Sequence, residues 1–286
     1  MPLVDGQVQV RDLVMGPGTP FVVEPGFDPW SVVVDAGQGG ARAWAHGGWS
    51  GAEWAAAVEV PVPVSIVANG DVSWQDARDE LSAAFSPVGD AVEATELRWV
   101  VGGREYVRFG RPRGAATTRA VPENGSSTVR ALFMALDQRI YSANETVQTF
   151  GLPTFVGGLT VPFTVPFTVD AVAVDGQADL VNEGTAEVGL SLRIDGPVIQ
   201  PWLTLQRPDG VVQTLRFRFS LTAGQWVEVD TEARTVFLNG LPQASRRGEV
   251  AGDFPVLPPG VSTLLFRAAE ESATAQVTAT YRSAWW

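Results

Sequence analysis

Apolar and polar residues alternate in short runs along most of this chain, which is the pattern of β-strands that bury one face. In the first third such runs cover Val4–Val10, Phe21–Glu24 and Ser31–Val34, with Pro-Gly turns between them. The run Glu59–Ala68 (EVPVPVSIVA) also alternates, but its two prolines cannot donate ladder hydrogen bonds. We therefore expect an edge strand there.

One segment follows the helical period instead. Ser73 stands where an N-cap residue belongs, and the acidic residues that follow suit the positive end of a helix. The apolar positions that share one face at helical spacing are Trp74, Ala77, Leu81 and Ala84/Phe85. The sequence predicts one short helix over 73–85, packed across a sheet and stopped by Ser86–Pro87.

Two neighbouring segments are read as strands. Residues 97–109 (LRWVVGGREYVRF) predict a hairpin that turns at Gly102–Gly103. Residues 129–140 fit a helix or a strand, and the alternation of Leu132, Met134 and Leu136 favours the strand.

Residues 36–55 are rich in glycine and tryptophan and have no clear period, which predicts a long, partly ordered loop. Its tryptophans are candidate anchors for a partner, because large apolar side chains on a loop favour protein contact. They can equally cap the core of their own domain, and the sequence leaves both interpretations open. These tryptophans are Trp44, Trp49 and Trp54.

The second half of the chain predicts a β-sandwich. Eight strand-like runs with turn signals between nearly all of them are typical of a two-sheet jelly roll. The runs are 169–175, 185–194, 201–206, 211–219, 226–230, 234–238, 261–266 and 275–282. A length of 286 residues favours two domains, which we place at 1–150 and 151–286. The terminal Trp285 and Trp286 are expected to pack against protein.

The formal net charge is −12, and all 20 basic residues are arginine. Such an acidic chain is a poor match for nucleic acid, because phosphate contacts need a basic surface. Six arginines and one acid nevertheless fall between Arg98 and Arg119. This cluster is either a solvated strand face or, as we favour, a contact with an acidic neighbour such as another copy of the chain. The candidate contact residues are Arg98, Arg104, Arg108, Arg111 and Arg113.

Residues for catalysis or metal binding are scarce. Cysteine is absent and His46 is the only histidine, so zinc ligation and thiol or Ser-His chemistry have no basis. We expect a protein that is not an enzyme and that holds no cofactor or metal. No signal pattern or membrane-length apolar run occurs, so we expect synthesis in a cytoplasm and no membrane contact.

Several turn-and-strand pieces, in this order, carry a resemblance to a known family. They are VNEGTA at 181–186, IDGP at 194–197, LTAGQWVEVDT at 221–231, PPG at 258–260 and YRSAWW at 281–286. With the helix 73–85 and the following hairpin ahead of them, the chain resembles the distal tail proteins of long, flexible-tailed phages, also described as minor tail proteins.

The resemblance implies a mainly β protein with two domains. The N-terminal domain would form a hexameric ring, and the C-terminal domain would be a galectin-like β-sandwich of jelly-roll type. The implied place is the virion tail tip, and the implied partners are the tail tube protein, the tape-measure protein and tail-tip hub or receptor-binding proteins.

Two other functions remain open on the sequence. One is a carbohydrate-binding module in which Trp202 and Trp226 stack on sugars, although both tryptophans also fit a sandwich core. The other is a tail-tube subunit, which the length of the chain disfavours.

Overall fold

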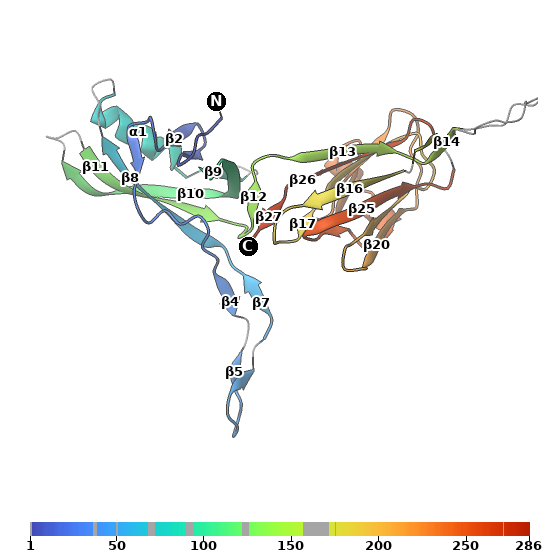
Figure 1. The fold of residues 1–286 in the computed structure, drawn as a ribbon, viewed down its shortest axis with the longest axis horizontal. Helices are drawn as coiled ribbons and strands as arrows, with labels where there is room; N and C mark the ends of the chain where they lie inside the picture. Colours follow the sequence, from blue (N-terminus) through green and yellow to red (C-terminus); the bar gives the residue numbers. More distant parts are fainter. Residues whose placement is uncertain are drawn as a thin grey trace, which may run out of the picture. The chain divides into compact units, whose positions relative to one another are not determined.

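The computed structural model describes residues 2–36, 39–49, 51–67, 72–87, 89, 94–121, 126–156, 172–174, 176–270 and 272–286. In this described part the chain is mainly β, with one α-helix, as predicted (Figure 1). It forms two compact units. The N-terminal unit comprises Met1–Asn144 with Trp285–Trp286, and the C-terminal unit comprises Glu145–Ala284.

The N-terminal unit is built on one antiparallel sheet with the order β2-β1-β9-β10-β11-β8-β3, and β12 also pairs with β10. The Gly16 amide donates to the Phe21 carbonyl at 2.7 Å, which links the ends of the two outermost strands. The elements are β1 (Val8–Val10), β2 (Leu13–Met15), β3 (Phe21–Val23), β4 (Val34–Ala36), β5 (Gly40–Ala41), β6 (Gly48–Trp49), β7 (Glu53–Ala55), β8 (Val58–Val67), α1 (Trp74–Ala84), β9 (Thr95–Val101), β10 (Arg104–Val121), β11 (Ser126–Ala135) and β12 (Ile140–Ser142).

The predicted helix is confirmed. The hydroxyl of Ser73 accepts a hydrogen bond from the Asp76 amide at 3.1 Å and so caps α1. The helix buries Ala77, Leu81 and Ala84 in the core of the unit, where β8 and β11 contribute their alternate side chains. The predicted hairpin at Gly102–Gly103 and the strand interpretation of β11 are also confirmed.

The expected edge strand is wrong as a description of β8, because β11 pairs with it along its whole length. On its other side β3 pairs only with Val64–Ile66. Pro61 and Pro63 lie beyond that contact, and the Pro63 carbonyl still accepts from the Glu24 amide at 2.9 Å. The missing proline N–H groups therefore fall where β3 has ended.

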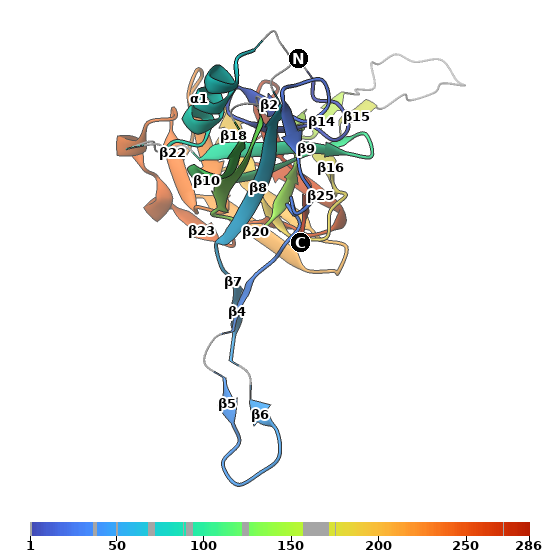
Figure 2. The same ribbon diagram turned by 90° about the vertical axis from the view of Figure 1, so that its left-hand side faces the viewer.

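The predicted loop at 36–55 is also wrong. Its described residues form a two-stranded arm in which β4 pairs with β7 and β5 with β6. Figures 1 and 2 show this arm extending away from the sheet of the N-terminal unit. Near its tip Trp44 and Gly47 have positive φ angles of 62° and 94°, which lets the chain reverse there.

The C-terminal unit is the predicted sandwich. Its two five-stranded sheets have the orders β13-β26-β18-β21-β22 and β16-β25-β19-β20-β23. All eight predicted runs overlap strands, and of the first run 169–171 and 175 lie outside the described residues. The strands are β13 (Thr146–Gly151), β14 (Thr154–Val156), β15 (Val172–Val174), β16 (Gln177–Asn182), β17 (Val188–Gly189), β18 (Ser191–Asp195), β19 (Trp202–Gln206), β20 (Val212–Phe217), β21 (Trp226–Asp230), β22 (Thr235–Leu238), β23 (Val250–Gly252), β24 (Val256–Leu257), β25 (Gly260–Arg267) and β26 (Gln276–Tyr281). The last strand, β27 (Ala284–Trp285), belongs to the sheet of the N-terminal unit.

The end of the chain is held in place, as expected for Trp285. Its ring meets Tyr106 edge-to-face, with the centroids 5.4 Å apart. Trp286 keeps 55% of its surface exposed, so the expectation of packing is only partly met there.

Asn182 holds the backbone conformation of the VNEGTA segment at 181–186 through hydrogen bonds. Its buried amide donates to the Ala186 carbonyl at 2.8 Å and accepts from the amides of Gly184 and Ala284 at 3.0 and 3.3 Å. A side chain at Gly184 would overlap the backbone of Ala284, so only glycine fits. This segment therefore fixes the backbone of Ala284, the last residue of the unit.

We predict that Asn182→Ala lowers the free energy of unfolding by about 3 kcal/mol, because it leaves buried backbone groups without partners. Denaturant unfolding of the full chain measures this loss. Asn144→Ala, at an exposed turn, is the matched control and should change stability little. Equal effects of the two variants would contradict the assigned role of Asn182.

Candidate assembly surfaces

The tip of the arm presents large aromatic side chains to solvent. The relative exposure of Trp44 is 104% and that of Trp49 is 54%, so neither caps the core of its own unit. Arg42 and His46 beside them are exposed as well. Trp54 lies in β7, but its side chain is outside the described residues. The arm tip is therefore a surface suited to contact with another molecule.

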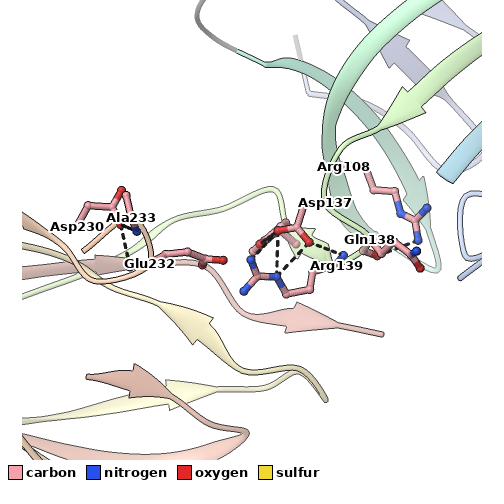
Figure 3. Close-up of polar contacts among 8 residues, drawn as sticks. Arg108, Asp137, Gln138, Arg139, Asp230, Glu232 and Ala233 are labelled. Carbon is pink, nitrogen blue, oxygen red and sulfur yellow. Dashed lines mark hydrogen bonds and ion pairs between the residues drawn. The ribbon is translucent and has the colours of Figure 1, made fainter. Parts of the chain in front are cut away.

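The root of the arm is held by Gln138, a residue that Figure 3 shows next to Arg108. Its side-chain oxygen accepts from the Val33 amide at 2.8 Å. Its side-chain nitrogen donates to the carbonyls of Val33 and Ala56. One buried amide thus joins the two backbone segments that enter and leave the arm.

Arg108 is fully buried and also binds the backbone at the root of the arm. Its Nη2 donates to the carbonyls of Ser31 and Gln138, each at 3.0 Å. Burial lowers the pKa of Arg108 to about 10, against the opposing attraction of Asp28 and Asp137. The prediction that Arg108 meets a neighbouring molecule is therefore wrong, because its charge never reaches the surface.

Asp137, next to Gln138, forms a local ion pair that Figure 3 also shows. The Arg139 guanidinium donates to its carboxylate at 2.7 Å. Burial opposes ionisation of Asp137, but the hydrogen bonds from Arg139 and Tyr141 outweigh it and lower the pKa of this carboxyl. The turn after β11 therefore carries little net charge.

The other predicted arginines differ in what they contact and in how exposed they are. Arg98 is paired with Glu105 at 3.0 Å, and Arg104 lies over the ring of Trp285 at 5.4 Å. Arg111 is half-buried, with Nη1 3.5 Å from the Gly89 carbonyl. Arg113 is exposed in the bulge between Pro112 and Ala115. The cluster is thus not one continuous surface.

A surface that the sequence did not single out lies on β8, β10 and β11. We call outer face the side of these strands that points away from the core. The register places Arg119 beside Thr128 and Arg130 beside Pro63, and both arginines are exposed. Arg130 is hard to find from sequence, because a lone arginine in an alternating strand normally signals only a solvated position.

The two tryptophans proposed as glycan contacts lie in the C-terminal unit, each half-buried. The Arg193 guanidinium sits 4.6 Å from the ring centroid of Trp226, and that of Arg216 sits 5.7 Å from Trp202. The Trp226 N–H also donates to Glu228 at 3.2 Å. An arginine therefore already occupies the place over each ring where a sugar would stack.

In the described part of the chain, no group of three or more His, Cys, Asp or Glu side chains is arranged to hold a metal ion. No helix there is long and apolar enough to cross a membrane.

Comparison with known proteins gives one family and one fold. Residues 183–285 match the family model of the siphovirus-type tail component, C-terminal domain. Among solved structures, the chain is similar to the Dit protein of phage SPP1, with 15% identity and a TM-score of 0.60, over 98% of this chain and 99% of that one. That structure is described as a paradigm of the hub adsorption apparatus in phages that infect Gram-positive bacteria.

A chain of the phage P2 baseplate, in its activated conformation with calcium, is also similar. The identity is 9% and the TM-score 0.52, over 97% of this chain and 98% of that one. At such identities the likeness concerns the fold. No curated protein matches the chain.

We predict that Gln138→Ala loosens the root of the arm, because Val33 and Ala56 lose their shared partner. Amide exchange at Val33 should rise by about tenfold or more, the equivalent of one lost hydrogen bond. Gln75→Ala, on the exposed side of α1, serves as control. Unchanged protection of the Val33 amide would show that the backbone alone holds the arm.

Proposed function

We propose that this chain, a siphovirus-type tail component with the fold of a distal tail protein, is a structural hub at the tip of a long phage tail. The observation that carries the proposal is the likeness to SPP1 Dit over nearly the full length of both chains. The family match over 183–285 supports it independently, from sequence.

The hub is a homo-hexameric ring in which the N-terminal units meet. Support comes from the arm, which exposes Trp44 and Trp49. Isolated two-stranded hairpins are marginally stable, so an arm of this kind gains most when another protein covers it. A second copy supplies that cover in a symmetric ring.

The arginines of β10 that remain near the surface belong to the same proposal. Arg104 and Arg113 are exposed, and Arg111 is half-buried, so these three are candidate contacts of the ring together with Arg98 at its ion pair. Charged groups at a protein interface mainly select the partner and its register. Arg108 is left out because it is buried.

The ring joins the tail tube to the proteins beyond it. Its partners in this proposal are the tail tube protein, the tape-measure protein and the hub or receptor-binding proteins of the tail tip. The place of action is the virion tail tip, after synthesis in the host cytoplasm. The role is structural and needs no catalytic residues.

We do not propose the carbohydrate-binding function. Sugar stacking needs an accessible aromatic face, whereas Arg193 lies over Trp226 and Arg216 over Trp202.

We predict an assembly near six times 30.5 kDa in the purified protein. Native mass spectrometry or mass photometry measures it, and negative-stain images should show rings. Higher salt should reduce the ring fraction, because it screens charges near the surface. A strict monomer at all concentrations would contradict self-assembly of the hub.

We predict that Trp44→Ser reduces the ring fraction without changing the fold of the monomer. The side chain is fully exposed, so its removal should leave the unfolding transition within about 0.5 kcal/mol of wild type. Trp286→Ser, another exposed tryptophan, provides a comparison at the chain end. Rings that form equally well with Trp44→Ser would remove the arm tip from the contact.

A further inference from the structure

The outer face of the N-terminal unit is partly apolar, and its exposed charges are Arg119, Arg130 and Glu59, which lies opposite Met134. Along β11, Arg130 is exposed while Leu132 and Met134 are only half-buried. Pro61 lies directly opposite Leu132 on β8, and Arg119 opposite Thr128 on β10. Along β11 the two exposed cations lie on one side of the half-buried aliphatic side chains, so apolar area and charge adjoin, as they do in protein contacts.

A hollow of about 420 Å³ opens at the end of this face. Arg119, Ser65 and Thr128 line it, together with Glu24. The Ser127 hydroxyl also lines it and is buried without a hydrogen-bond partner in the described part of the chain. The hollow therefore places a cation, a carboxylate and hydroxyl groups together, which suits a polar side chain of a neighbour.

The exposed side of α1 carries more carboxylates than cations. Its one arginine, Arg78, lies 3.9 Å from the carboxylate of Asp79. In α1, Asp76, Asp79 and Glu80 are exposed, while Ala77 and Leu81 point into the core. The carboxylates of the helix thus face away from the sheet that it covers.

Asp12 adds a further carboxylate beside α1. It lines a cavity of about 230 Å³ with Arg11, Leu13, Glu80 and Ala84. This side of the unit therefore has a recess of mixed polarity, which a side chain of a neighbour can enter.

The two sides of the unit differ in the sign of their excess charge: the exposed arginines Arg119 and Arg130 outnumber Glu59 on the outer face, and the carboxylates outnumber Arg78 on α1. The side chain of Arg130 points away from the core side of β11, whereas α1 packs on the core side. Two different, complementary surfaces on one chain make a heterologous contact, which generates a closed ring when the rotation between copies closes.

We propose that the outer face of one copy, with Arg119 and Arg130, binds the acidic face of α1 of the next copy, with Asp79 and Glu80. This contact rests on the proposed ring and names the two surfaces that form it. Exposed ion pairs contribute little each, so Leu132 and Met134 supply the buried area and the charges set the register.

Two charge-reversed variants test the contact. The basic-face variant carries Arg119→Glu and Arg130→Glu, and the helix variant carries Asp79→Arg and Glu80→Arg. In the first, both surfaces are acidic; in the second, the outer face stays basic and the α1 face loses its acidic character. Each variant alone should lose the ring, with a fall in the ring fraction of about tenfold or more in mass photometry.

An equimolar mixture of the two variants should form rings again, because alternating copies then meet with opposite charges at each contact. Six positions accommodate such alternation. Native mass spectrometry distinguishes the mixed rings from either pure species by mass.

The matched control reverses two exposed arginines of the C-terminal unit, Arg216→Glu with Arg218→Glu, and should keep the ring. Circular dichroism and the unfolding transition establish that every variant is folded. Rings in either single variant, or a folded mixture without mixed species, would overturn the proposed contact. If the wild-type chain forms no ring, the proposed hub assembly fails separately, and a lack of complexes between the two variants then rejects the contact too.

Discussion

The two-residue period of β8 and β11 is the constraint on which the N-terminal unit depends. These strands send alternate side chains into the core, among them Val129, Ala131 and Phe133, and the remaining positions must point outward. A slip of one residue would bury Arg130 and expose Phe133, so the register is firmly fixed. The register that makes the core therefore also defines the outer face, and with it the surface that is available to a second copy.

The arm depends on a different interaction, because it has no core of its own. Its root is fixed by buried polar groups, since Gln138 and Arg108 bind the carbonyls where the chain enters and leaves the arm. Only Nη2 of Arg108 has hydrogen-bond partners, whereas Nε and Nη1 are buried without one among the described residues. The two bonds of Nη2 are therefore what offsets the burial of this cation, and they tie the root of the arm to β10. Beyond the root the described side chains of the tip are exposed, and further stabilisation has to come from outside the unit.

Alternation was enough to predict most strands, and capping chemistry was enough to predict α1. The arm was missed because residues 36–55 carry glycine and alanine where a strand usually shows an apolar period, and only backbone pairing defines it. Arg108 was misplaced for a related reason. In β10 the apolar Val107 and the charged Arg108 are both fully buried, so the alternating pattern gives no sign that both faces of this strand are covered there. Charge counted along the sequence cannot separate a buried arginine from an exposed one.

The segments that carried the family resemblance lie where the backbone geometry restricts which residue type can fit. Gly184 lies against Ala284, Gly196 lies against Leu221 and Thr222, and Asn182 satisfies backbone groups that would otherwise be buried without partners. Such residues record the fold of the C-terminal unit and say little about assembly. Residue identity is less restricted at contacts between identical copies, because two surfaces of one chain need only complement each other. A fold shared at 15% identity with SPP1 Dit is therefore compatible with contact residues that are particular to this chain, and these have to be found from exposure, charge and register.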